Sequence, residues 1–227
     1  MISHEEQLKL FTDIATKLTK TVSCYSFGGT AMMFNGMKSE TKDIDLLFTT
    51  VDDRQVFIDA LKENGFHVSS PFHVYIKRKE SDPRAPVMFR RYDVRIDLFA
   101  ESVFRSRLSP LLRENTTAVH EFGENRNLKL FIVNTESLVY LKGITERDKD
   151  FEDIKNIVAT DKNFNWDLVV DEALWQHGHG DDWALVDTEK TLQQMRAYMQ
   201  IEEKHLKRLH DAQRRALGTD GHHKLSI

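Results

Sequence analysis

The sequence predicts an α/β fold followed by a helical C-terminal region. The chain has 227 residues, which at roughly 150 residues per domain is more than one small domain. Hydrophobic residues make up 40% of it and charged residues 30%, a balance that supplies a sizeable core and excludes disorder over the whole chain. Strand-like and helix-like segments alternate up to about residue 134, and only helical patterns follow. We therefore expect an α/β domain at 1–134 and a helical module at 135–227.

The first elements alternate between the two periodicities. Residues 5–20 carry apolar side chains every three or four positions, which predicts a helix. Residues 21–27 are rich in β-branched and aromatic side chains and predict a strand. Residues 43–49 alternate at first and then become apolar, as in a strand covered on both faces. A second helix is expected over 52–64, where Gly65 provides a stop.

Strand patterns dominate the middle of the chain. Two β segments are expected near 72–79 and 86–91, around a loop whose prolines favour a sheet edge or a turn. Residues 94–100 predict a further strand. Residues 117–122 and 128–133 predict a hairpin around a polar, glycine-containing turn.

From residue 135 onward the pattern is helical. Helices are expected at 135–143, 148–160, 166–176 and 187–217. The last of these carries an apolar stripe, and such a stripe usually packs on its own domain. A seam for a homodimer or another partner is the alternative.

Charge and composition exclude several classes of protein. The chain has 32 Lys and Arg against 36 Asp and Glu, a net charge of −4, whereas proteins that mainly hold duplex nucleic acid are usually basic. No apolar run approaches the ~18 residues of a membrane span, and the acidic start is unlike a signal peptide. The single cysteine, Cys24, cannot form an internal disulfide. We expect a cytoplasmic protein without a membrane association.

Three aspartates form the first candidate site. Asp43 and Asp45 are two residues apart on one predicted strand, so their side chains share a face. Asp97 lies on a second strand, on the same face as Arg95. Crowded carboxylates repel each other, and a shared divalent cation removes that penalty. An isolated Asp-x-Asp is more often a solvated strand end, but the accompanying features favour a site for Mg²⁺ or Mn²⁺.

A glycine turn and a lysine form the second candidate site. Gly28-Gly29-Thr30 follows a strand and precedes a short helical stretch, an arrangement that can offer backbone N–H groups to a phosphate. A plain turn is the alternative. Lys142 follows an apolar helical segment and is a candidate phosphate contact, with a solvated helix lysine as the alternative.

Together these segments resemble a known superfamily. Three segments in order are similar to the pattern of DNA polymerase β-like nucleotidyltransferases: Phe27 to Thr30, Asp43 to Leu46, and Ile96 to Leu98. Thirteen residues separate Gly29 from Asp43. Leu141 to Asp150 followed by Asp153-Ile154 resembles the helix pair of its AbiEii-like bacterial and archaeal branch, which includes toxin-type transferases. The resemblance covers roughly residues 5–160, and nothing after them matches.

The resemblance implies a small mixed sheet and a metal-dependent reaction. A nucleoside monophosphate would pass from an NTP, such as ATP, to an acceptor hydroxyl with release of pyrophosphate. Asp43 and Asp45 would hold two Mg²⁺ ions, and Asp97 would complete the second metal site and help to take the acceptor proton. Gly28, Gly29 and Thr30 would hold the β- and γ-phosphates, and Lys142 would add a phosphate contact.

Other functions of the same fold stay open. The chain could be a scaffold that binds a nucleotide or a protein without turnover. It could also be the toxin of a toxin–antitoxin pair, acting on tRNA or on a protein and bound by an antitoxin. The negative net charge favours a small-molecule or protein acceptor over a long nucleic acid.

Overall fold

A computed structural model gives the fold and describes residues 1–69, 84–145 and 147–220. The β segment expected at 72–79 lies outside these ranges, as does Glu146 of the helix-pair motif. Over the ranges described, no helix has both the length and the apolar character needed to cross a membrane.

Strands and helices are mixed up to residue 133, and the described residues from 135 to 220 contain helices but no strand. The strands are β1 (Ile2–Ser3), β2 (Val22–Phe27), β3 (Glu40–Thr41), β4 (Asp43–Phe48), β5 (His67–Ser69), β6 (Val87–Arg91), β7 (Val94–Ala100), β8 (Ser102–Val103), β9 (Ser106–Arg107), β10 (Thr116–Phe122) and β11 (Leu128–Val133). The helices are α1 (His4–Ala15), α2 (Gly28–Phe34), α3 (Val51–Glu63), α5 (Pro110–Glu114), α6 (Thr135–Gly143), α7 (Asp148–Thr160), α8 (Trp166–Gly178), α9 (Ala184–Met195) and α10 (Glu203–Asp220). The α/β class is confirmed.

The main sheet is mixed, as the resemblance implied. Its strand order is β10-β11-β2-β4-β7-β6-β5, with the short strands β8 and β9 continuing from β7. The central strand β4 is antiparallel to β2 and parallel to β7. Every residue of β4 is buried, which confirms that this strand is covered on both faces. The hairpin of β10 and β11 is also confirmed.

The two faces of β4 meet different helices. Phe48 packs on Phe57 of α3 with ring centroids 5.1 Å apart. Asp45 points to the opposite face, since it lies three positions before Phe48 and side chains alternate along a strand. There its carboxylate lies against Gly28 at the start of α2. The face covered by α2 is therefore the one on which the candidate aspartates stand.

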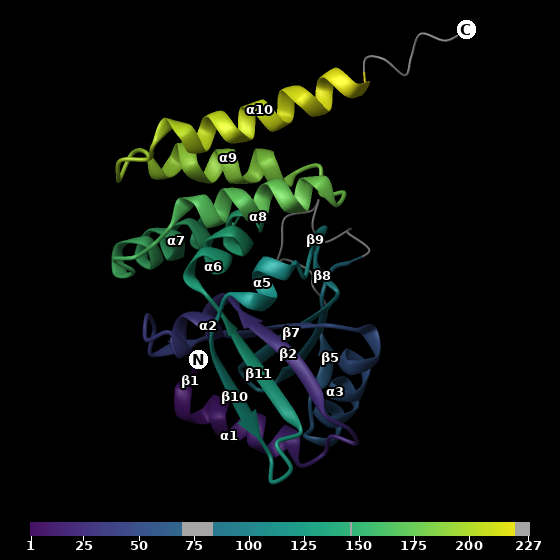
Figure 1. Ribbon diagram of the computed structural model, residues 1–227. Coiled ribbons are helices and arrows are strands. Elements are labelled where there is room, and N and C mark those ends of the chain that lie inside the picture. The colour runs from purple at the N-terminus through teal and green to yellow at the C-terminus, as the bar shows by residue number, and fades with distance from the viewer. Residues whose placement is uncertain (70–83, 146, 221–227) are drawn as a thin grey trace, which may run out of the picture.

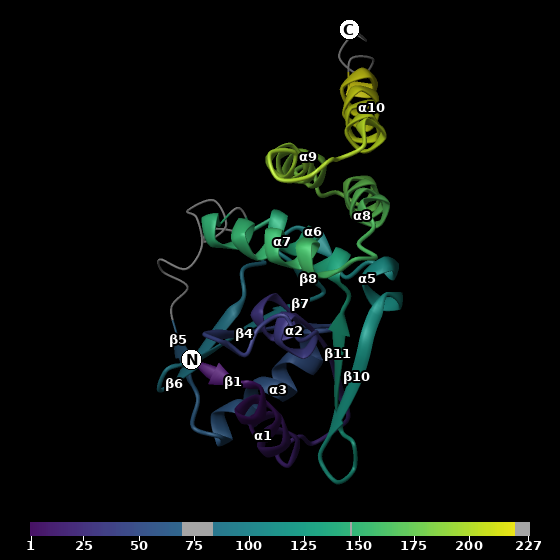
Figure 2. The ribbon, with the colours of Figure 1, turned by 90° about the vertical axis from the view of Figure 1, so that its left-hand side faces the viewer.

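The C-terminal helices stack on one side of the sheet. Helices α6 to α10 lie above the strands, and α9 and α10 are the most distant from them (Figures 1 and 2). The single helix expected over 187–217 is wrong, because the chain forms α9 and α10 with a reversal between them (Figure 1). Two separate helices can bury apolar residues of α9, such as Leu192, and of α10, such as Leu209, between neighbouring helices. One straight helix would carry them apart.

The change from sheet to helices is abrupt in the sequence but not in the core. Strand β11 ends at Val133, and Asn134 caps α6 by accepting a hydrogen bond from the Ser137 N–H. One cluster of buried apolar side chains extends from the sheet helices through α6 to α10. The division into domains 1–134 and 135–227 stays a prediction.

Helix α8 is fixed to the sheet connection by buried polar contacts. The fully buried Gln176 accepts a hydrogen bond from the Arg107 N–H at 2.8 Å and donates to the Arg107 carbonyl at 2.6 Å. Ser109 donates to Glu172 at 2.7 Å. Burial raises the pKa of Glu172, against the opposing effect of its hydrogen bonds with Gln176 and Ser109. These contacts satisfy polar groups that would otherwise be stranded between α8 and the β9–α5 connection.

We predict that Gln176→Ala lowers the free energy of unfolding by about 2–4 kcal/mol, because it leaves both backbone groups of Arg107 without their partner. The measurement is urea unfolding followed by circular dichroism. Gln193→Ala is the matched control, since Gln193 makes an exposed hydrogen bond to Glu189, and its effect should stay within about 0.5 kcal/mol. Equal destabilisation by the two substitutions would contradict a docking role for Gln176.

Candidate active site

Three aspartates meet on the face of the sheet that α2 covers. The parallel register of β4 and β7 places Asp45 beside Asp97 and Asp43 beside Arg95. Asp45 and Asp97 are buried, with exposed fractions of 5% and 0%. Side chains of directly paired residues in neighbouring strands point to the same side of the sheet. The structure thus brings together the three carboxylates that the sequence selected, while their role stays a prediction.

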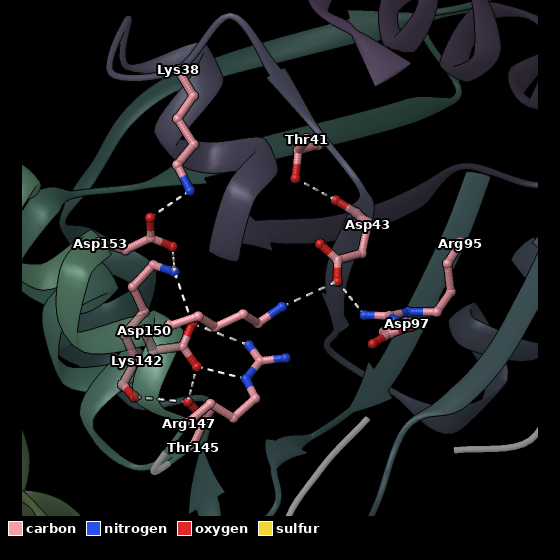
Figure 3. A network of polar contacts seen from close by, with 11 residues as sticks. Lys38, Thr41, Asp43, Arg95, Asp97, Lys142, Thr145, Arg147, Asp150 and Asp153 are labelled. Atoms are coloured by element: carbon pink, nitrogen blue, oxygen red, sulfur yellow. Dashed lines mark hydrogen bonds and ion pairs between the residues drawn. The ribbon is translucent and has the colours of Figure 1, made fainter. Parts of the chain in front are cut away.

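Arg95 lies between two of these carboxylates. Its Nε donates to Asp97 Oδ1 at 2.9 Å, and its Nη2 donates to Asp43 (Figure 3). Burial alone would lower the pKa of Arg95, but Asp97, Asp43 and Asp45 outweigh it and the pKa is raised. The alternation of side chains in the sequence predicts that Arg95 and Asp97 share a face of the strand. The contact of Arg95 with Asp43 could not be predicted in this way, because it depends on the register of β4 and β7. Arg95 thus pairs with two of the three carboxylates, and its single positive charge offsets one of their negative charges.

Asp45 is left without such a partner. No described side chain forms a hydrogen bond or an ion pair with its carboxylate. Burial, followed by the nearby charges of Asp43 and Asp97, raises the pKa of Asp45 to about 8. The surroundings of this carboxyl group therefore favour its protonated form.

The glycine pair allows close packing between α2 and two strands. Gly28 has a φ of +61°, and a Cβ there would lie 2.0 Å from Asp45 Oδ2. A Cβ on Gly29 would lie 2.1 Å from Thr41 Oγ1. Both positions are thus restricted to glycine by contacts within the chain. Thr30 is fully buried, and phosphate binding by the turn stays a prediction.

A charge network on α6 and α7 faces the aspartates (Figure 3). Lys142 Nζ lies 3.2 Å from Asp150 Oδ1 and 2.6 Å from Asp153 Oδ2. Arg147 Nε donates to Asp150 at 2.6 Å, and Lys38 pairs with Asp153. Burial raises the pKa of Asp150, but Lys142 and Arg147 lower it further, so the net shift is downward. The candidate phosphate contact Lys142 is therefore held in place by two carboxylates.

One cavity of about 410 Å³ connects the aspartates, the glycines and this network. That volume is within the range of small-ligand sites. Its walls include Gly28, Gly29, Asp43, Asp45, Lys38, Lys42, Lys142, Arg147, Lys149, Asp150 and Asp153. Asp97 and Thr30 do not line it. Lys149 crosses towards the acidic side, with its Nζ 3.9 Å from Asp43 Oδ2. An acidic wall thus faces a basic wall in the same cavity.

The acidic wall has suitable chemistry for a divalent cation. Its donors are carboxylate oxygens alone, and the unpartnered Asp45 is short of compensating positive charge. In the part of the chain that the structure describes, however, no group of three or more acidic, His or Cys side chains is arranged to hold a metal ion. Arg95 is paired with Asp43 and Asp97. The carboxylates of Asp43 and Asp45 are the ligand type that Mg²⁺ or Mn²⁺ prefers, and metal binding by the three aspartates stays a prediction.

Comparison with known proteins gives a likeness in structure and none in sequence. No family model matches the chain, and no curated protein matches it. The fold is similar to the crystal structure of the lincosamide antibiotic adenylyltransferase LnuA with lincomycin bound, with 14% sequence identity and a TM-score of 0.45. The likeness covers 70% of this chain and 99% of that one. The resemblance to the AbiEii-like branch stays a prediction.

We predict that Asp45→Asn changes how stability depends on pH in metal-free protein. A pKa raised to about 8 means that the folded state binds a proton that the unfolded state has already lost. Wild-type stability should therefore fall as pH rises between the unfolded pKa of about 4 and the folded value, by at most about 1.4 kcal/mol per pH unit from this group. The Asp45→Asn variant has no carboxyl group at this position, so this fall in stability with rising pH should be absent from it.

The measurement is urea unfolding of both proteins at pH 5, 6, 7 and 8 in the presence of a chelator. The variant should gain stability relative to wild type at each step. Asp93→Asn, in the exposed turn before β7, is the control and should follow the wild-type curve. Parallel curves for Asp45→Asn and wild type would show that Asp45 is already ionised throughout this range.

Proposed function

We propose that this protein is a divalent-metal-dependent nucleotidyltransferase. It would move a nucleoside monophosphate from an NTP, such as ATP, to an acceptor hydroxyl and release pyrophosphate. The observation that carries the proposal is the pair of opposed walls in one cavity, with Asp43 and Asp45 on one side and cations of α6 and α7 on the other. A metal-bound triphosphate needs both, since the acidic side holds cations and the basic side holds phosphate oxygens.

The three aspartates have different proposed roles on the acidic side of the cavity. Asp43 and Asp45 would hold Mg²⁺ or Mn²⁺, with Asp97 as a further ligand. When bound, such ions supply positive charge that stabilises the attacking and leaving oxygens of an in-line displacement. Asp97 would also accept the proton of the acceptor hydroxyl. Because Asp97 is fully buried and bonded to Arg95, both of its roles require Arg95 to move first.

The basic side would bind the triphosphate. Gly28, Gly29 and Lys142 line the cavity, which supports their proposed contacts with the phosphates. Lys142 is already paired with Asp150 and Asp153. A phosphate that contacts the Lys142 ammonium group would therefore bind it together with these two carboxylates. Thr30 is fully buried and is not among the residues that line the cavity, so its proposed phosphate contact has no such support.

A scaffold without turnover is the second candidate, and one observation favours it. Arg95 already pairs with both Asp43 and Asp97, which is an arrangement that a protein without a metal could keep permanently. The two functions differ in one outcome. A scaffold binds the nucleotide but never releases pyrophosphate.

The test is to incubate the protein with each α-labelled NTP and Mg²⁺, together with total tRNA, with a small-molecule extract, with a protein extract or with no acceptor. We predict label on one acceptor class, and a loss of about 10³-fold or more in Asp43→Asn and Asp45→Asn, because each removes a metal ligand. Asp93→Asn is the matched control and should keep activity within about twofold.

Melting curves establish that each variant is folded. Label on tRNA or on a protein would identify a toxin-like acceptor, and label in the small-molecule extract would identify a modifying enzyme. NTP binding with no pyrophosphate release in any mixture would replace the transferase proposal with the scaffold.

A further inference from the structure

A second cavity lies beyond the other end of the central strands. Its volume is about 570 Å³, which is also typical of a small-ligand site. Thr49, just after β4, and Glu101, just after β7, form part of its floor, and β9, α5 and the end of α8 form its sides. The charged and aromatic residues that line it are Arg84, Arg107, Arg113, Glu101, Trp175 and His179.

This cavity is separate from the candidate active site. The two share no lining residue. Between Asp45 and Thr49 on β4 stands Leu47, which is paired in register with Phe99 of β7. Both are 1% exposed, and Phe99 packs edge-on against the fully buried Phe104 at 5.5 Å. An apolar layer thus divides the two cavities along the same strands.

The cavity carries an excess of positive charge. Arg107 and Arg113 are exposed, and no carboxylate among the described residues pairs with either of them. Arg84 donates to the Arg105 carbonyl at 3.4 Å. Among the described residues that line the cavity, Glu101 is the one acid, and it also interacts with Arg54. The exposed guanidinium groups of Arg107 and Arg113 are suited to phosphate oxygens.

An aromatic wall stands beside the arginines. Trp175 and His179 are stacked, with ring centroids 3.8 Å apart and planes 16° apart. Both line the cavity, and the His179 Nδ1 lies 2.7 Å from the Trp175 carbonyl oxygen, which holds the stack. Stacked rings next to cationic side chains are suited to a planar ring joined to an anion.

We propose that this cavity binds a small phosphorylated ligand that carries a planar ring, the class to which nucleotides belong. The arginines would contact the phosphate, and the Trp175–His179 stack would contact the ring. The site is additional to the candidate active site and does not depend on nucleotidyl transfer.

The experiment titrates AMP and ribose 5-phosphate into metal-free protein by calorimetry. We expect one AMP per chain, with AMP bound about tenfold more tightly than ribose 5-phosphate because only AMP stacks. The double variant Arg107→Gln with Arg113→Gln should weaken AMP at least tenfold. Arg126→Gln is the matched arginine control, since Arg126 is 76% exposed at the hairpin turn. Lys42→Gln tests the candidate active site, whose cavity Lys42 lines.

Three outcomes would overturn the proposal. The first is that AMP does not bind. The second is that Lys42→Gln reduces the affinity for AMP while the double arginine variant leaves it unchanged. The third is that the protein binds AMP and ribose 5-phosphate with equal affinity. A melting curve confirms that the double variant is folded. Both substitutions change exposed side chains, and the backbone of Arg107 that Gln176 holds remains.

Discussion

The crowding of three carboxylates on one buried sheet face is the constraint on which the rest of the structure depends. Two strands run parallel with Asp45 beside Asp97, so the charges cannot separate without breaking the register. Arg95 compensates Asp43 and Asp97, and the remaining group responds by retaining its proton. A buried charge excess of this kind costs stability unless something binds to it. This is the physical reason for treating the face as a site rather than as part of the core.

The helical module completes that site because it supplies the opposite charge. Lys142 and Arg147 belong to the α6–α7 region, and Asp150 and Asp153 orient them towards the cavity. Buried ion pairs contribute little net stability but fix side-chain geometry. The apolar cluster that runs from the sheet into these helices therefore also fixes the distance between the acidic and the basic wall.

Much of the fold and part of the site could be predicted from the sequence, and the differences have physical causes. Alternation placed Asp43 and Asp45 on one face, because a strand repeats every two residues. It could not show that Arg95 bridges Asp43 and Asp97, since strand register is a tertiary property. The missed break after α9 has no glycine or proline to mark it, and it exists because α9 and α10 pack on each other.

The contact between Gly28 and Asp45 also has an evolutionary consequence. The missing Cβ of Gly28 leaves the space into which Asp45 Oδ2 fits, so neither position can accept a larger residue while the other is unchanged. A side chain at position 28 would require the Asp45 carboxylate to move, and it would also need the left-handed backbone conformation that Gly28 adopts at a φ of +61°. The two positions therefore constrain each other, although sixteen residues lie between them in the chain.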